Sequence, residues 1–224
     1  MPNTNSSLAA RWSSVNELLQ FFYQQGELKD FPPQTQLFRQ GEAINTICQI
    51  ESGLVKLTHT SEQGIMMTAA LRFPGTMLSA AAAISGNPAP ASAVTLEPSQ
   101  MYCLAVETFL QQLKTNIKFA NEVARAISQN FYEQTLHQAR LGTLRAPGRV
   151  AQLLLQFLPR AVPEQNGEMC LQLPISDSDA ARLLMISPEH FSRTLKQLKT
   201  RGLIRRSKGW IYINDLEALR REAE

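Results

Sequence analysis

Short segments that mix apolar and β-branched residues recur along the first half of the chain, between residues 31 and 106. Turn residues such as Ser52-Gly53 and Pro74-Gly75 separate them. Short strands at this spacing are typical of a β-sandwich, roll or barrel. The pattern predicts six strands, over Thr35–Phe38, Ile47–Glu51, Leu54–Thr58, Met66–Leu71, Ser92–Thr95 and Met101–Val106.

From Thr108 onward, apolar residues recur every three or four positions, and neither Gly nor Pro intervenes between Pro98 and Gly142. That period predicts an amphipathic helix of roughly 30 residues. Its length and continuous apolar stripe favour dimerisation through a second copy of the helix, the alternative being that it lies across its own domain. The residues predicted to face the partner are Leu113, Ile117, Ala120, Ala124, Ile127 and Phe131.

Other elements are predicted on either side of these two regions. A short helix is expected over Ser13–Tyr23, capped by Ser13 or Ser14. Beyond the long helix, a break is expected between Leu136 and Pro147, where Gly142 and Pro147 occur. A helix over Arg149–Leu158, a loop over Pro159–Gly167 and a strand over Met169–Leu173 follow. We therefore divide the chain into a β domain at 1–107, a dimerisation helix at 108–141 and a third domain at 142–224.

The third domain contains two helix starts close together. Ser176-Asp177-Ser178-Asp179 has the form of a capping box, so a helix is predicted to begin near Asp177. Ser187 is a good cap and Pro188 suits the first helical position, so a second helix is predicted from Pro188 to about Arg201, ending at Gly202. Two short helices joined by a tight turn form a helix-turn-helix. Met185 occupies a turn position where Gly is common, and we interpret it as tolerated.

The second of these helices carries the chemistry of base recognition. Glu189, Ser192 and Arg193 share one side of its first turns, which enter the major groove in this motif. Arg bonds guanine bidentately, Glu accepts from cytosine N4, and Ser bonds either kind of group. The alternative is that Glu189 and Arg193 form only a surface ion pair.

Basic residues follow in the same region. Seven of them and no acidic residue lie between Arg193 and Lys208. Such a run indicates either a solvated face or a phosphate-binding patch. Leu203–Arg206, a turn at 207–209 and Trp210–Ile213 predict a hairpin, the wing of a winged helix. The predicted contacts to the DNA backbone are Ser187, His190, Lys196, Lys199, Arg205 and Lys208.

Composition excludes several classes of protein. The net charge of +3 is unequally distributed: −1 up to Arg140 and +4 beyond it. No apolar run reaches the roughly 18 residues of a membrane helix, and no signal peptide is evident. Three widely spaced cysteines argue against a disulfide framework and for a reducing cytoplasm. The chain has no P-loop, G-x-S-x-G or H-E-x-x-H motif, so we expect neither enzymatic activity nor a metal site.

Motifs along nearly the whole chain resemble those of the CRP/FNR family of bacterial transcription regulators. The resemblance implies an α+β protein with a cyclic-nucleotide-binding-type, jelly-roll-like β-roll, a dimerising long helix and a C-terminal winged helix-turn-helix. It also implies a homodimer that reads a palindrome. The segments that carry it are Phe38-Arg39-Gln40-Gly41-Glu42, Ser52-Gly53-Leu54-Val55-Lys56-Leu57, Phe73-Pro74-Gly75, Ser92-Ala93-Val94-Thr95-Leu96 and Ile186-Ser187-Pro188-Glu189-His190-Phe191-Ser192-Arg193.

The recognition helix of this chain is similar to that of the FNR-like branch. The family's Glu-x-x-Ser-Arg arrangement falls on Glu189, Ser192 and Arg193, which in that branch accompany half-sites of the type TTGAT. The cyclic-AMP branch has an Arg one residue before the Glu, where this chain has Pro188. The FNR-like half-site is therefore favoured.

The sensor region departs from both branches. The family's ribose-binding Glu falls on Ala80, and its phosphate-binding Arg on Ala89 or Ala91. A buried cyclic phosphate without a cation is costly, so we predict no tight binding of cyclic AMP or GMP. No cysteine precedes Cys48, which argues against a four-cysteine iron–sulfur cluster.

The segment that replaces these groups is almost wholly apolar. It forms either an effector site for haem or a small organic ligand, or a closed core. The residues assigned to this candidate pocket are Met77, Leu78, Ala80, Ala89, Ala91 and Ser92. Candidate haem ligands are His59, His137, Met residues, Cys48 and Cys103, and no spacing singles one out. Cys48 and Cys103 are expected to be small buried hydrophobes rather than redox sensors.

Together these features predict a homodimeric, sequence-specific DNA-binding transcription regulator controlled by an unidentified effector. Double-stranded DNA is the expected partner, with RNA polymerase in addition if the protein is an activator. The alternative is a ligand-binding module that regulates a protein partner through its winged helix. Lack of salt-dependent affinity for DNA would favour that alternative.

Overall fold

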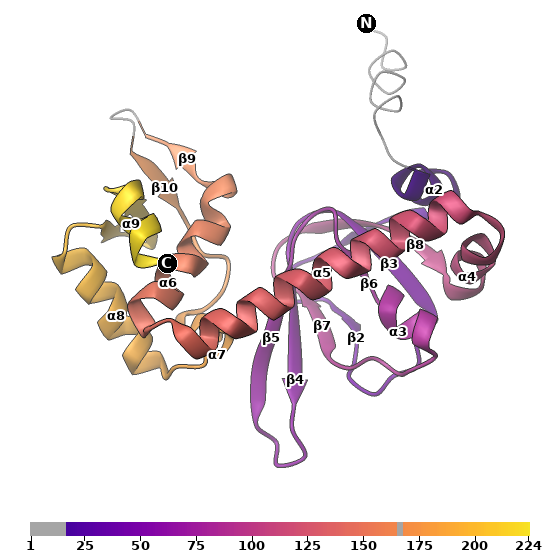
Figure 1. Cartoon of the computed structure of the whole chain (residues 1–224), viewed down its shortest axis with the longest axis horizontal. Coiled ribbons are helices and arrows are strands. Elements are labelled where there is room, and N and C mark those ends of the chain that lie inside the picture. The colour runs from indigo at the N-terminus through magenta and orange to yellow at the C-terminus, as the bar shows by residue number, and fades with distance from the viewer. Residues whose placement is uncertain (1–16, 165–167) are drawn as a thin grey trace, which may run out of the picture. The chain divides into compact units, whose positions relative to one another are not determined.

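The computed structural model describes residues 17–164 and 168–224 of the chain. The chain divides between Glu133 and Gln134 into two compact units, whose elements Figure 1 labels. The first is built on two β-sheets with helices alongside, and the second combines helices with a small sheet. The predicted α+β class, with a β-roll, a long helix and a winged helix-turn-helix, is confirmed.

Two four-stranded antiparallel sheets form the roll. One has the order β1-β8-β3-β6 and the other β2-β7-β4-β5. All six predicted strands are present, together with two strands that the sequence pattern does not predict. The missed β1 is largely exposed and therefore lacks alternation, while β6 has only two residues. The strands are β1 (Glu27–Phe31), β2 (Gln36–Phe38), β3 (Thr46–Ser52), β4 (Val55–Thr60), β5 (Met66–Arg72), β6 (Met77–Leu78), β7 (Ser92–Thr95) and β8 (Ser99–Ala105).

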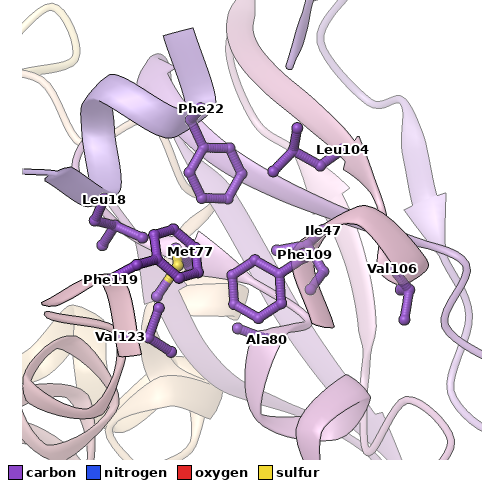
Figure 2. Packing of buried hydrophobic residues seen from close by; sticks show 10 residues of the cluster. All are labelled: Leu18, Phe22, Ile47, Met77, Ala80, Leu104, Val106, Phe109, Phe119 and Val123. Carbon is purple, nitrogen blue, oxygen red and sulfur yellow. The ribbon is translucent and has the colours of Figure 1, made fainter. Parts of the chain in front are cut away.

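Buried side chains of the roll form two clusters, one on each face of the β1-β8-β3-β6 sheet. Ile50 and Met101 of this sheet pack with Val55 and Ala93 of the other sheet, which fills the interior of the roll. On the opposite face, helical side chains cover the sheet (Figure 2). That second cluster comprises Leu18, Phe22, Ile47, Met77, Ala80, Leu104, Val106, Phe109, Phe119 and Val123.

The long helix is shorter than predicted because the chain breaks at Asn116. One helix, α4 (Val106–Thr115), ends there, and α5 (Ile117–Thr143) begins immediately after it. Asn116 has extended backbone angles, and its side-chain oxygen accepts the Phe119 N–H at 3.0 Å. This cap ends one helix and starts the next without any Gly or Pro. Leu113 therefore lies on α4, where it packs against its own core, and not on the long helix.

Two shorter helices flank the roll. The N-terminal helix, α2 (Glu17–Gln25), lies close to the predicted position, while its predicted caps Ser13 and Ser14 lie outside the described residues. A further helix, α3 (Ala80–Ser85), occupies the apolar segment after β6. Ser79 precedes it with a left-handed backbone, φ 71°, where the chain turns from strand to helix.

The break predicted between Leu136 and Pro147 is confined to two residues. Gly142 remains inside α5, and Pro147 lies in the first turn of the next helix, α6 (Ala146–Phe157). Proline costs little at that position because its missing N–H would have no partner there. Gly148 is required by packing, since a Cβ at that position would lie 2.7 Å from the Glu222 carbonyl oxygen.

The second unit has the predicted order of elements. A short 3-10 turn at Leu158–Arg160 and strand β9 (Val162–Pro163) occupy part of the segment predicted as a loop. A four-stranded antiparallel sheet has the order β11-β12-β10-β9. The remaining elements are β10 (Met169–Leu171), α7 (Asp177–Leu183), α8 (Pro188–Thr200), β11 (Ile204–Ser207), β12 (Trp210–Ile213) and α9 (Leu216–Glu222).

The pairing of two cysteines overturns the expectation that Cys48 and Cys103 are simply small buried hydrophobic residues. A disulfide joins Cys48 to Cys103, although 55 residues separate them in the sequence. Strands β3 and β8 pair antiparallel and place the two residues directly opposite each other, with Cα atoms 4.3 Å apart. Sequence spacing alone therefore missed a contact that strand register creates.

Within residues 17–164 and 168–224, no helix combines the length and apolar character needed to cross a bilayer.

Candidate nucleic-acid interface

The helix-turn-helix is built from two capped helices. Ser176 Oγ accepts the Asp179 N–H at 3.0 Å, which is the N-cap half of the predicted capping box, and the Ser176 hydroxyl donates to the Asp179 carboxylate. Ser187 caps α8 by accepting the His190 N–H at 3.2 Å. Between them, Met185 has φ 53° and is 57% exposed. This left-handed position explains why glycine is common there, and Met185 tolerates it at a cost in backbone strain.

One side of α8 faces the core of the domain. Phe191, Leu195 and Leu198 are buried, as their spacing predicts, and Thr194 is buried among them. Thr194 was missed because a threonine at this spacing carries no apolar signal. The other side of α8 is exposed and carries Glu189, Ser192 and Arg193, the three residues predicted to read bases.

Glu189 is held ionised at the start of this helix. Its pKa is lowered first by a hydrogen bond from backbone N–H at the helix terminus, then by the Ser187 hydroxyl and by the charge of Arg193. An ionised carboxylate is an acceptor only, which suits cytosine N4. The same electrostatic link to Arg193 also fits the alternative of a surface ion pair, and this geometry is compatible with both interpretations.

The predicted backbone contacts divide into two groups. Exposed residues His190, Lys196 and Lys199 lie on α8, and Lys208 lies at the tip of the β11–β12 hairpin with φ 48°. Ser187 serves the helix cap as well as being exposed. Among the described residues, no ion pair involves the three lysines, so their charges remain available to phosphates.

Arginine side chains at the wing are already engaged. Arg205 donates to Glu168 at 2.9 Å and lies 3.7 Å over the Tyr212 ring. The Glu168 hydrogen bond raises the pKa of Arg205. Arg206 binds Asp177 through two hydrogen bonds, and Arg201 is paired with Glu222. The seven cations of the run are therefore not one uniform patch, and Arg205 would have to share its guanidinium with a phosphate.

The residues assigned to the effector pocket do not share one environment. Met77 and Ala80 lie in the cluster beneath the helices, whereas Leu78 lies in the interior of the roll. Ala89 and Ala91 are buried, and Ser92 accepts the Gln40 N–H at 3.0 Å. A surface hollow of about 390 Å³ beside α3 is lined instead by residues that include Gly41, Ile44, Ala82, Pro88 and Val106.

The candidate haem ligands have other partners. His59 Nδ1 forms a hydrogen bond of 3.0 Å with the Pro90 carbonyl oxygen. His137 hydrogen-bonds the Leu183 backbone, and burial is the largest influence on its pKa, which is lowered. Cys48 and Cys103 are bonded to each other. Within the described residues, no group of three His, Cys, Asp or Glu side chains is arranged to hold a metal ion.

Arg72 is a charged residue of the sensor unit that the sequence pattern does not assign to the pocket. It is the last residue of β5 and is half-buried. Burial lowers its pKa, and the carboxylate of Glu133 opposes that effect. The signal in the sequence was a lone arginine immediately before the uncharged segment that begins at Phe73.

Comparisons with known proteins match both units. The model of the cyclic nucleotide-binding domain matches residues 28–116, and that of the Crp-like helix-turn-helix domain matches residues 148–222. A CRP-like cAMP-activated global transcriptional regulator of Mycobacterium tuberculosis is 24% identical over 87% of each chain. The cyclic AMP receptor protein of Thermus thermophilus is 26% identical over 84% of each chain. The structure of FixK2 from Bradyrhizobium japonicum, 18% identical, superimposes with a TM-score of 0.77 over 89% of this chain and 98% of that one.

Proposed function

Since the chain belongs to the CRP/FNR family of DNA-binding transcription regulators, we propose that it acts as a homodimer on a palindromic site with TTGAT-type half-sites. The observation that carries this proposal is the exposed face of α8. Glu189, Ser192 and Arg193 lie there over a buried apolar face, next to Lys196 and Lys199. Side chains suited to base recognition thus lie beside side chains suited to phosphate binding on one helix.

The homodimer is supported by the apolar residues of α5. Ile117, Ala120, Ala124, Ile127 and Phe131 follow a spacing of three and four residues, the repeat of a coiled coil, although Ile127 is partly buried against the core of its own unit. Ile117 is 74% exposed and Phe131 is 72% exposed. Large apolar side chains at that exposure favour burial against a second copy of the helix. Two identical recognition helices related by a two-fold axis then favour a palindromic site.

We infer that the β-roll does not bind a cyclic nucleotide tightly, although two of the relatives are named for cyclic AMP. Ala80, Ala89 and Ala91 are buried and supply no charge at the positions aligned with the ribose-binding Glu and phosphate-binding Arg. A cyclic phosphate there would lose its hydration without gaining a cation. We expect a different effector and no cyclic AMP or GMP affinity of micromolar strength or better by calorimetry.

The proposal is tested by fluorescence anisotropy with the purified full chain and no added ligand. A duplex carrying TTGAT-N4-ATCAA is compared with a scrambled duplex at the same salt concentration. A preference of roughly a thousandfold supports specific recognition by the ligand-free dimer. Equal weak binding to both duplexes contradicts ligand-free recognition of this half-site, and absence of salt-dependent binding favours regulation of a protein partner.

A further inference from the structure

The disulfide between Cys48 and Cys103 lies inside the β-roll. The two residues are opposite each other on β3 and β8, and both side chains belong to the cluster between the two sheets, with Ile50 and Met101 nearby. Cys103 is 7% exposed, and Cys48 is half-buried. Cys48 is the more exposed of the two residues, so we expect it to meet a small oxidant first.

The third cysteine does not compete for this pairing. Cys170 lies in the other unit, is 6% exposed, and is the free cysteine of the described chain. Its thiol donates to the Val162 carbonyl oxygen at 3.3 Å. Since only Cys48 and Cys103 are expected to react with an oxidant, oxidation should give one product, a disulfide within the chain.

The position of the pair links it to the helices of the sensor unit. Cys48 is also the register partner of Leu78 on β6, and α3 begins two residues after Leu78. Cys103 is followed by Leu104 and Ala105, after which α4 begins at Val106. A bond at this position fixes β3 to the strand that leads directly into α4, and α5 follows α4.

We propose that Cys48 and Cys103 form a reversible redox site of the β-roll, oxidised by a hydroperoxide and reduced by a dithiol. A regulator that binds chromosomal DNA works where thiols are kept reduced, and disulfides in such compartments are mostly transient or redox-sensing. The pair then exists as two thiols at rest and as the disulfide under oxidation. This inference goes beyond the proposed function, and only its effect on DNA affinity rests on that function.

The chemistry balances with one hydroperoxide for each disulfide. The Cys48 thiolate attacks one peroxide oxygen and breaks the O–O bond, which gives a sulfenic acid and, after protonation of the leaving oxygen, water or an alcohol. The Cys103 thiolate then attacks the sulfenic sulfur, forms the S–S bond and releases water. The two thiols lose two electrons and two protons in total, and the peroxide accepts both electrons. A dithiol reverses the change by thiol–disulfide exchange.

The test uses the full chain carrying Cys170→Ala, so that only the two proposed thiols remain. The protein is reduced, treated with hydrogen peroxide and examined by mass spectrometry of the intact chain and of its peptides. We expect a product lighter by two hydrogen atoms, a cross-linked peptide pair containing Cys48 and Cys103, and full reversal by dithiothreitol. Sulfinic acid, cross-links between chains or no reaction would overturn the proposal.

Two matched variants and a DNA measurement complete the design. Cys48→Ala and Cys103→Val, each in the Cys170→Ala chain, are expected to yield no intrachain cross-link. Reduced and oxidised protein are expected to differ in DNA affinity by about fivefold or more. Equal affinity in the two states would overturn the regulatory effect. A chain that binds DNA in neither state would contradict the function proposed above, whereas the mass measurement tests the redox site by itself.

Discussion

Arg206 of the wing and Asp177 at the start of α7 form a two-point ion pair. Arg206 Nη1 lies 3.1 Å from Asp177 Oδ2, and Nη2 lies 3.1 Å from Oδ1. The planar guanidinium matches the carboxylate in a way that a lysine ammonium does not. This pair connects the hairpin to the first helix of the helix-turn-helix and leaves Lys208 alone at the hairpin tip.

A double-mutant cycle measures how strongly this pair holds the wing. Both side chains are about half exposed, so we expect Asp177→Asn and Arg206→Gln to be coupled by about 0.5–1 kcal/mol of unfolding free energy. Urea unfolding of the two single variants and the double variant gives that coupling. Arg206→Lys should recover only part of it. Strictly additive effects would show that the pair contributes nothing in solution.

Asn116 is predicted to stabilise the start of the long helix. Its side-chain oxygen satisfies the Phe119 N–H, and an alanine would leave that donor without a protein partner. We expect Asn116→Ala to lower the unfolding free energy by about 0.5–2 kcal/mol, and Asn116→Asp to preserve most of it. Chemical denaturation monitored by circular dichroism checks this. Equal stability of Asn116→Ala and the parent chain would contradict the cap.

Gln49 is a buried amide that is predicted to weaken the sensor unit. It is 1% exposed, and neither atom of its amide has a hydrogen-bond partner in the described structure. Its cross-strand neighbours are Met77 and Tyr102. An unsatisfied buried polar group costs about 1–3 kcal/mol, so Gln49→Leu should raise the unfolding free energy by about 1 kcal/mol or more.

Gln49→Glu serves as the opposing control. It places a charge at the same buried position and should lower the melting temperature. If Gln49→Leu instead destabilises the protein, the amide is bound in solution by water or by an effector. Differential scanning calorimetry of the three chains separates these outcomes.

His137 is predicted to make the second unit sensitive to acid. Burial lowers its pKa, and nearby Arg140 acts in the same direction, while the hydrogen bond to the Leu183 backbone opposes them. The neutral form is therefore favoured in the folded state. The stability that neutral His137 contributes is fully present above its pKa in the unfolded chain, about 6.5. It is lost as the pH falls through the lower pKa of His137 in the folded protein.

His137→Gln should flatten that loss. We expect its urea midpoint to fall less than that of the parent chain between about pH 7.5 and pH 5. His190→Gln, a change at an exposed histidine of the same unit, is the matched control. Identical pH dependence in the parent and His137→Gln would show that His137 does not titrate with folding.

Local signals predicted much of this fold. Ser176 and Ser187 mark helix starts through their own hydroxyls, and the apolar and β-branched residues of β3 or β4 are visible within a few residues. Features that depend on distant parts of the chain were not predictable in this way. The bond between Cys48 and Cys103 follows from strand register, and the engagement of Arg205 follows from Glu168 and Tyr212 in other elements.

The break at Asn116 shows a different limit. A continuous apolar period indicated one helix, because Phe109 and Leu113 lie in phase with the residues after the break. The cap that divides the helix uses one asparagine, which the period does not register. On the candidate interface, the pattern separated the exposed face of α8 from its core but gave no information on which cations are already paired.

The exposed face of α8 is proposed to read bases. Arg193→Ala is compared with Lys199→Ala by anisotropy on the TTGAT palindrome and on a duplex with each guanine of the half-sites replaced. We expect Arg193→Ala to lose about 1–3 kcal/mol on the parent site and little on the replaced site, whereas Lys199→Ala weakens both equally and reduces the salt slope by about one. Equal loss on both duplexes for Arg193→Ala would contradict base recognition by this helix.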